Sequence, residues 1–505
     1  MKKKLILNVV FFTILLSIVP TYANAQKEDR LWQDETIYSL MIDRFNNANT
    51  KNDYFVNTQD PLAYNGGDLQ GVIDKMDYIK DMGFTTIRLT SIFENTERGY
   101  HGYWVKDFYK TEEHFGSLET FKKLVKEAHA RDLRIIIDFV TNNVSSEHPW
   151  IADPSKEDWF HEKREISDWS NQQQVETGWF NSLPDLNHEH TEVKDYLIEA
   201  AKWWIENTDI DGYTLPEVNH VPISFWTEFS EEIKLEKKDF ILIGVPSTTP
   251  NLQKENYLSA GIDGMYDYAS ANLLREVFGS NNQSLNTKFE THDSQLRINF
   301  FDNEKTTRFT SNIVENKHFP GARWKTALTF LYTSPGIPVV FYGSEIALNG
   351  EEIPDNHRLM NFRTEKELMD FITKLGELRN QLLSLTRGDI EMIYDKNGMM
   401  VFKRSYENET AIIAINNSSE SQNVTLSSEQ IAPEKELRGL LKGDLVRNID
   451  GEYPIIIDRD EAEIYVIAEK SGINLSLIGA LAAVYLLFMW FLITVLRRRK
   501  RSNIS

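Results

Sequence analysis

Cysteine is absent from the 505 residues of this chain. Its absence excludes disulfide bridges, thiolate metal sites and cysteine nucleophiles. The chain can do without disulfides because 41% of its residues are hydrophobic and 12% are aromatic, which is enough for a large core. The same composition excludes an intrinsically disordered protein. At about 100–200 residues per domain, the length predicts two or three domains.

Basic residues are also scarce. Lysine and arginine number 55 against 76 aspartates and glutamates, so the formal net charge is −21. Some of the basic residues lie at the two ends of the chain, which leaves the central part more acidic still. An acidic body does not bind nucleic acid by counterion release, so we expect no nucleic-acid partner.

Apolar runs occur at both ends of the chain. Residues 1–25 combine three lysines, a short apolar run and small residues before Gln26, which is the layout of a cleaved secretory signal peptide. An uncleaved N-terminal anchor is the alternative. Residues 473–496 predict a transmembrane helix, because 475–496 contains no charge and is long enough to span a bilayer. The basic tail 497–505 is then cytoplasmic by the positive-inside rule, and the body of the chain is extracellular.

Between these ends, strand-like runs alternate with amphipathic helical stretches. Residues 134–140 read as a buried strand, and residues 117–132 carry apolar side chains at helical spacing. The repeated alternation predicts parallel βα units and a barrel over residues 26–372, with a long connection at about 143–185. Strand-like runs separated by turns then predict a small antiparallel β domain over residues 373–469.

Several motifs resemble the α-amylase family, glycoside hydrolase family 13, and they follow that family's order along the chain. They are IYSLMIDRFNN, NGGDLQGVIDKMDYIKDMG, GYHGYWVKDFYK, RIIIDFVTNN, LPDLNHEHTEV and TSPGIPVVFYGSEIALNGEEIPDNHRLMNF. The resemblance implies an α/β fold: a (β/α)8 TIM barrel with a short inserted domain after strand 3. It also implies a C-terminal antiparallel β-sandwich.

The family's catalytic positions are occupied by unsuitable residues. Hydrolysis by this family uses a nucleophilic carboxylate and a carboxylic acid across the scissile bond, and a third carboxylate on strand seven. The matching positions are Pro216 for the nucleophile, Val245 for the acid and Lys305 for the third carboxylate. Three supporting positions also differ. Thr214 stands where the family has an arginine, and Asn143 and Glu304 stand where it has histidines.

Two displaced carboxylates remain near these positions, Glu217 and Glu304. Successive side chains of an extended segment point to opposite faces, so we expect both carboxylates to point away from the cleft. The chain is therefore predicted to be a pseudoenzyme. The alternative is an active α-glucan hydrolase or transglycosylase that uses Glu217 and Glu304.

Other positions that match the family's sugar cleft are kept. The resemblance implies substrate contacts from these residues: His101, Tyr103, Trp104, Asp355 and Arg358. They favour binding of α-glucan or maltooligosaccharide, although the aromatic residues could instead only pack the barrel mouth. A second hypothesis is a scaffold for an unknown membrane protein partner.

The resemblance also implies structural Ca²⁺. Asn-rich loops supply the hard oxygen ligands that Ca²⁺ prefers. The first predicted site consists of Asn47, Asn49, Asn52, Asp53, Gly66 and Asp68, and the alternative there is a turn whose side chains bond its own backbone. The second predicted site consists of Asn142, Asp185 and the backbone carbonyl of His220.

Overall fold

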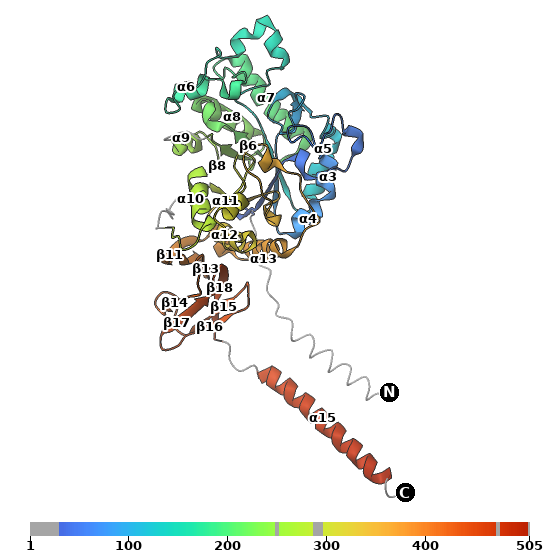
Figure 1. Cartoon of the computed structure of the whole chain (residues 1–505), viewed down its shortest axis with the longest axis vertical. Coiled ribbons are helices and arrows are strands. Elements are labelled where there is room, and N and C mark those ends of the chain that lie inside the picture. The colour runs from blue at the N-terminus through green and yellow to red at the C-terminus, as the bar shows by residue number, and fades with distance from the viewer. Residues whose placement is uncertain (1–29, 248–251, 286–295, 471–474, 503–505) are drawn as a thin grey trace.

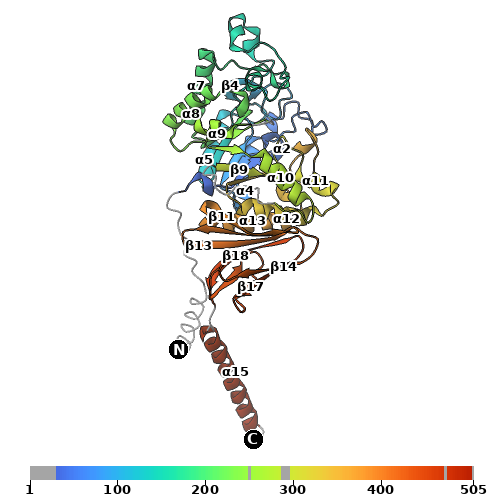
Figure 2. The same cartoon turned by 90° about the vertical axis from the view of Figure 1, so that its left-hand side faces the viewer.

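The computed structural model describes residues 30–247, 252–285, 296–470 and 475–502. Figures 1 and 2 show a large α/β part, a smaller β part beside it and one separate helix near the C-terminus. The predicted signal peptide, residues 1–25, lies outside the described residues.

The large part is a closed barrel of parallel strands in the order β1-β10-β9-β8-β7-β6-β5-β2. This confirms the predicted TIM barrel. The strands are rich in Ile, Val and Leu and almost wholly buried, as expected for parallel strands covered on both faces. Their bounds are β1 (Ile37–Leu40), β2 (Thr86–Leu89), β5 (Arg134–Asp138), β6 (Gly212–Pro216), β7 (Ile241–Val245), β8 (Gly264–Tyr266), β9 (Leu296–Phe300) and β10 (Ile337–Phe341).

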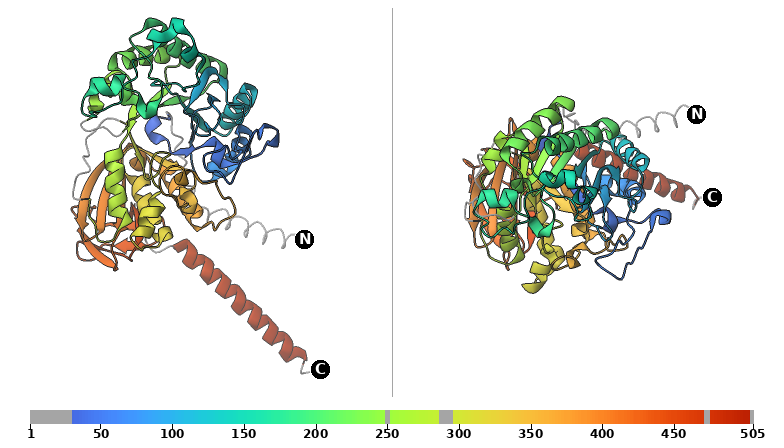
Figure 3. Two further views of the ribbon diagram at one scale, coloured as in Figure 1. Left: turned by 45° about the horizontal axis from the view of Figure 1, so that its top comes forward. Right: turned by 90° about the horizontal axis from the view of Figure 1, so that it is seen from above.

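Helices cover the outside of the barrel (Figure 3). Helix α5 (Leu118–His129) begins after Ser117, whose hydroxyl accepts a hydrogen bond from the backbone N–H of Thr120. Its buried side chains recur at helical spacing, as the sequence predicts. The other helices of the barrel are α2 (Ile42–Phe45), α3 (Leu69–Asp74), α4 (Met76–Asp81), α7 (Thr191–Thr208), α8 (Ile223–Glu236), α9 (Lys254–Ser259), α10 (Tyr268–Gly279), α11 (Phe309–Glu315), α12 (Pro320–Thr333) and α13 (Glu367–Gln381).

Two additions lie beside the ends of the barrel strands. A hairpin of β3 (Phe93–Asn95) and β4 (Val105–Thr111) follows β2. The insertion after the third barrel strand contains only short helices, and Figure 1 shows it at the end of the molecule remote from the β domain. These helices are η3 (Pro149–Ala152), η4 (Pro154–Trp159), α6 (Gln172–Thr177) and η5 (Phe180–Ser182).

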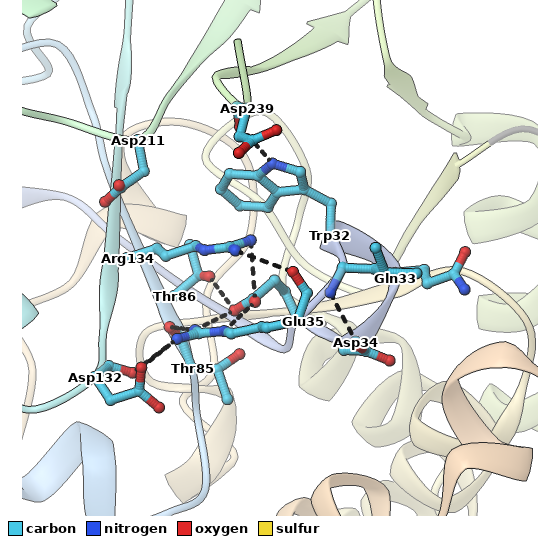
Figure 4. A network of polar contacts seen from close by, with 12 residues as sticks. Trp32, Gln33, Asp34, Glu35, Thr85, Thr86, Asp132, Arg134, Asp211 and Asp239 are labelled. Atoms are coloured by element: carbon cyan, nitrogen blue, oxygen red, sulfur yellow. Dashed lines mark hydrogen bonds and ion pairs between the residues drawn. The ribbon is translucent and has the colours of Figure 1, made fainter. Parts of the chain in front are cut away.

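At the opposite end of the barrel, residues 32–35 join a network of polar contacts with the beginnings of β2 and β5 (Figure 4). Glu35, which is 1% exposed, contacts Arg30 at 2.6 Å and Arg134 at 3.2 Å, and accepts a hydrogen bond from Thr86 at 2.7 Å. The Arg134 guanidinium also lies 4.1 Å from the centre of the Trp32 ring. These contacts hold residues 30–35 against the beginnings of β2 and β5. The carboxyl ends of the strands, where barrel proteins carry their sites, lie at the other face.

The smaller part is antiparallel. One six-stranded sheet has the order β11-β12-β13-β18-β15-β16, and β14 pairs with β17 in a second sheet. Apolar side chains from both sheets, such as Val401, Ile412, Val424 and Ile455, form one core, which confirms the predicted sandwich. The strands are β11 (Asp389–Lys396), β12 (Met399–Tyr406), β13 (Glu409–Asn416), β14 (Gln422–Ser427), β15 (Lys435–Gly439), β16 (Leu445–Arg447), β17 (Glu452–Ile457) and β18 (Glu461–Glu469).

The predicted boundary at residues 372/373 falls inside α13. This helix buries Leu368, Ile372, Leu375 and Leu378, a helical spacing that continues through the boundary. A short helix, α14 (Leu383–Arg387), follows, and the β domain starts with β11. The change of architecture therefore lies about one helix later than the sequence pattern suggests.

Helix α15 (Leu475–Ser502) stands apart from the folded parts. Its segment Gly479–Arg497 has a mean hydropathy of 2.3, and none of it is buried. By length and composition this helix is able to cross a membrane.

Candidate functional site

A cavity of about 480 Å³ opens at the carboxyl ends of the barrel strands. Its walls come from the β3–β4 loop, from the segments that follow β5, β6, β9 and β10, and from the insertion. A volume of this size lies within the usual range of small-molecule sites. The lining residues are His101, Tyr103, Trp104, Val140, Asn143, Phe180, Asn181, Leu183, Glu217, Glu304, Lys305, Ile353 and His357.

A buried arginine organises the floor of this cavity. Arg88, on β2, donates to Asp138 at 2.8 and 2.6 Å and to Glu304 at 2.8 and 3.1 Å. It also donates to the Ser39 hydroxyl at 3.0 Å. All three charged side chains are at most 2% exposed. Arg88 thus forms two bidentate ion pairs and compensates much of the charge of two buried carboxylates.

This arrangement determines the protonation of Glu304. Burial by itself would raise the pKa of Glu304, but the Arg88 guanidinium overcomes that effect and lowers the pKa to about 2. Burial raises the pKa of Asp138 to about 6, against the opposing effect of Arg88. The Tyr103 hydroxyl donates to Asp138 at 2.7 Å. Glu304 is therefore an ionised structural partner of Arg88 at neutral pH.

The expectation that Glu217 and Glu304 point away from the cleft is wrong, because both line the cavity. Glu217 follows β6 with a left-handed backbone, φ 51° and ψ 37°. A left-handed residue breaks the alternation of an extended chain and redirects the side chain. Glu304 lies beyond the end of β9, where alternation no longer applies, and its carboxylate turns inward to Arg88.

Lys305 also lines the cavity, and its ammonium group lies 2.5 Å from Glu217 Oε1. The two side chains are 26% and 13% exposed. This ion pair lies inside the cleft, where partial burial strengthens the attraction between the charges.

The other two positions predicted to match catalytic carboxylates, Pro216 and Val245, hold no titratable group. Pro216 and Val245 end strands β6 and β7 and lie side by side in the sheet register. Both are buried, and Val245 belongs to the apolar core of the barrel. Asn143, at a supporting position, lines the cavity with a side-chain oxygen that is buried without a hydrogen-bond partner among the described residues.

The predicted sugar contacts separate into two groups. His101, Tyr103 and Trp104 form one wall of the cavity, with the His101 and Tyr103 rings stacked at 5.6 Å. Asp355 and Arg358 do not line it; they are exposed and pair with each other at 2.7 Å. Their part in sugar binding therefore stays a prediction.

His357 was not predicted, yet it lines the cavity and is 3% exposed. Its Nε2 lies 2.7 Å from the backbone oxygen of Glu304, and its Nδ1 lies 3.0 Å from the Tyr100 hydroxyl. Burial lowers the pKa of His357 to about 4, so the imidazole is neutral at physiological pH. Its position in the PDNHR motif, directly before Arg358, was the available signal.

The second predicted metal site has converging oxygen atoms. The Asn142 side-chain oxygen lies 3.0 Å from Asp185 Oδ1 and 3.1 Å from the backbone oxygen of His220. Asp185 is fully buried, and its Oδ2 lies 2.7 Å from His161 Nδ1. A cation among the three oxygens would satisfy all of them, whereas rotating the Asn142 amide gives two hydrogen bonds instead. The donor set is the hard type that suits Ca²⁺.

The first predicted metal site is less complete. Asn47 donates to Asp53 at 3.0 Å beside Gly66, and the buried Asn52 side-chain oxygen has no hydrogen-bond partner among the described residues. The Asp68 carboxylate, however, already accepts hydrogen bonds from the backbone N–H groups of residues 48, 49 and 71. Asn49 accepts from the backbone of Lys51 at 3.4 Å, as in an Asx turn.

Carboxylate and histidine side chains do not gather in groups of three or more that could hold a metal in the part of the chain that the structure describes. The two predicted sites therefore depend on amide and carbonyl oxygens as well as on single carboxylates. Of the two, the Asn142 site fits a cation better, because its oxygens face one another without donors between them.

Comparison with known proteins agrees with this architecture. Residues 38–381 match the family of α-amylase catalytic domains, and residues 388–465 match the α-amylase C-terminal domain. A β/α-amylase of Paenibacillus polymyxa is 32% identical over 472 residues, which cover 88% of this chain but only 39% of that relative's length. A cyclomaltodextrinase of Thermoanaerobacter pseudethanolicus is 30% identical and covers 80% of this chain and 74% of its own length.

Solved structures are similar over the same region. An α-amylase of Anoxybacillus is 55% identical with a TM-score of 0.86, over 88% of this chain and all of that one. An α-amylase of Geobacillus thermoleovorans, solved in complex with acarbose, is 49% identical with a TM-score of 0.84 and the same coverage.

Proposed function

Because the chain belongs to the α-amylase family, glycoside hydrolase family 13, and lacks the carboxylates that this family uses, we propose that it is a membrane-tethered pseudoenzyme. It binds α-glucan or maltooligosaccharide in the barrel cleft without cleaving it. The observation that carries this proposal is the pairing of both remaining cleft carboxylates with cations, Glu304 with Arg88 and Glu217 with Lys305.

The chemistry of glycoside hydrolysis supports the loss of activity. A retaining enzyme holds a nucleophile and a protonated acid about 5–5.5 Å apart across the glycosidic bond. Glu304, with a pKa of about 2, carries no proton to donate at neutral pH. Glu217 is bound to an ammonium group, which reduces the nucleophilicity of its oxygen. General acid catalysis alone is worth about 10²–10⁴-fold, so a cleft without an acid is a poor hydrolase.

The retained aromatic wall supports sugar binding. Tyr103 and Trp104 present partly exposed rings to the cavity, and His101 packs against both. Such a wall with a few polar groups is the usual composition of a ligand site. The similarity to a Geobacillus α-amylase that binds acarbose supports a maltooligosaccharide as the ligand class.

Calcium is the structural cofactor we propose for this protein. Asn142, Asp185 and the His220 carbonyl would hold one ion, and the loop that contains Asn47 and Asp53 would hold another. Bound Ca²⁺ would supply charge and coordination that tie the insertion to the barrel. The ion would have no part in a reaction.

Tethering is supported by the composition of α15 and by the basic residues that follow it. In this proposal the barrel lies outside the cell and the C-terminal tail inside. Protease treatment of intact cells that express a C-terminally tagged chain tests this topology. The proposal requires the barrel to be digested and the tag to survive.

The test of function uses the full chain in lipid nanodiscs. Starch, pullulan, cyclodextrin and nitrophenyl maltosides are incubated with the wild-type chain and with a Glu217→Gln, Glu304→Gln double variant. Turnover by the wild type that the double variant loses would overturn the proposal in favour of an active hydrolase or transglycosylase. Binding by calorimetry without turnover supports it.

Absence of both turnover and binding would favour the scaffold hypothesis. Crosslinking in membranes followed by purification of the chain should then recover a membrane protein partner. A matched double variant of an exposed pair, Glu157→Gln and Glu162→Gln, controls for the loss of two negative charges.

A further inference from the structure

The Lys305–Glu217 ion pair, called here the cleft bridge, joins segments from two barrel strands that are not neighbours. Glu217 follows β6 and Lys305 follows β9, and β7 and β8 lie between these strands in the barrel. Neighbouring strands lie about 4.8 Å apart, so the bridge joins segments whose strands are about 14 Å apart along the sheet. It therefore crosses the mouth of the barrel.

The bridge divides the mouth into two parts. The ends of β7 and β8 lie on one side of it. The aromatic wall of His101, Tyr103 and Trp104 comes from the loop that follows β2 and β3, and so lies on the other side. A sugar chain that reaches from the wall to the end of β7 has to pass over the bridge or break it.

Both ends of the bridge are held by their own backbones. On the Lys305 side, the backbone N–H donates to the Asn303 side chain at 3.0 Å, and Asn303 in turn donates to the Tyr268 hydroxyl at 2.7 Å. On the Glu217 side, the left-handed residue caps the short helix η6 (Val218–His220), and its carbonyl accepts from His220 at 2.8 Å. The two backbones that carry these side chains are thus fixed at both ends of the bridge, which lowers the entropy cost of the contact.

Resting on the proposed function, we propose that the cleft bridge restricts glucan binding to the side of the aromatic wall, and so sets how many glucosyl units the cleft accepts. Lys305 and Glu217 act here as specificity-determining residues. Lys305, at the position predicted for the family's third carboxylate, forms one end of this barrier.

The bridge predicts how affinity depends on chain length. In the wild-type chain, affinity should stop increasing after the first few glucosyl units, because further rings meet the bridge. A Lys305→Ala, Glu217→Ala double variant opens the space in front of β7 and β8. For the longest oligosaccharides its affinity should rise about tenfold above wild type, which corresponds to about 1.4 kcal/mol.

The experiment is calorimetric titration of the full chain in nanodiscs with maltose through maltoheptaose. The control is a Lys194→Ala, Glu228→Ala double variant, which removes an ion pair of 2.7 Å between α7 and α8 with the same 26% exposure of its lysine. It should keep the wild-type dependence on chain length. A charge-swapped Lys305→Glu, Glu217→Lys variant rebuilds the bridge and should return the alanine variant's profile towards wild type.

The outcomes separate the two proposals. Equal dependence on chain length in the wild type and in the alanine double variant would overturn the bridge proposal while leaving glucan binding intact. Absence of binding in every variant would overturn both. Binding by the alanine variant alone would support the barrier and overturn glucan binding as the function of the native chain. If the alanine variant does not fold, a Lys305→Met, Glu217→Gln variant takes its place, because it removes both charges but keeps the length of the side chains; a wild-type dependence on chain length in that variant would overturn the bridge proposal.

Discussion

Removing the charge of Arg88 should destabilise the whole barrel. Arg88→Met keeps the length of the side chain but leaves Asp138 and Glu304 buried without a cation. Breaking a buried ion pair by removing one partner costs about 3–5 kcal/mol. Unfolding entropy is about 2.1 cal/mol/K per residue, so a chain of this size should lose about 3–5 °C in Tm.

The same variant should acquire a characteristic pH dependence. In the wild type, the pKa of Glu304 is lowered to about 2. Glu304 therefore contributes stability that is fully present above its unfolded pKa and is lost as the pH falls through its folded pKa. Without Arg88, burial is the dominant effect and raises the folded pKa of both carboxyl groups. The folded variant then binds more protons than the unfolded chain, so its deficit should shrink as the pH falls.

Chemical denaturation at about pH 7.5 and about pH 5 measures both effects through the free energy of unfolding. Arg131→Met, which removes exposed contacts with Asp77 and Glu127, should cost less than about 1 kcal/mol at either pH. If the free energy of unfolding of Arg88→Met at the higher pH lies within about 1 kcal/mol of the wild-type value, as expected for the exposed Arg131 contacts, this result refutes the argument. A deficit that grows on acidification would also refute it.

Further expectations concern titration, calcium and ligand choice. The hydrogen bond that His129 donates to the Asp211 carboxylate raises the pKa of His129, so His129 contributes stability that is present below its unfolded pKa and lost as the pH rises through the folded pKa. His129→Gln should therefore cost more at about pH 5.5 than at about pH 8.5 in denaturant titrations, and equal costs would contradict this. Ca²⁺ at about 100 times the Kd of the Asn142 site should, through that site, stabilise the wild type by about 2.7 kcal/mol in thermal scans against EDTA. Asp185→Asn should lose most of that gain, whereas the exposed Asp168→Asn should keep it. Acarbose, which carries an amine, should bind no tighter than maltotetraose, because the Lys305 ammonium group lines the cleft and repels a second cation. A large preference for acarbose in calorimetry would count against the proposed cleft chemistry.

Local prediction failed where the backbone departs from regular geometry. The alternation rule placed Glu217 outside the cleft, but its left-handed backbone directs the carboxylate inward. Asp355 and Arg358 matched a motif, yet they pair with each other at the surface. The predicted boundary at residues 372/373 falls inside α13, whose buried apolar side chains continue at helical spacing to Leu378.

Long-range pairing could not be predicted from the sequence at all. Arg88 and Glu304 are 216 residues apart, and Lys305 and Glu217 are 88 residues apart. Nothing in the local pattern indicates which acid each cation meets. These contacts nevertheless determine which cation each carboxylate of the cleft binds.

By itself, the amino-acid sequence determined the barrel, the β-sandwich and the apolar C-terminal helix, and it placed Pro216, Val245 and Lys305 at the positions predicted for the catalytic carboxylates. Periodicity, motif order and residue identity are local properties, and each can be read along the chain. Only the tertiary structure decided which cations hold the remaining acids and where the cleft is crossed. Closure of a barrel brings distant strand ends together, and the partners of a charge are set by that closure rather than by its neighbours in the chain.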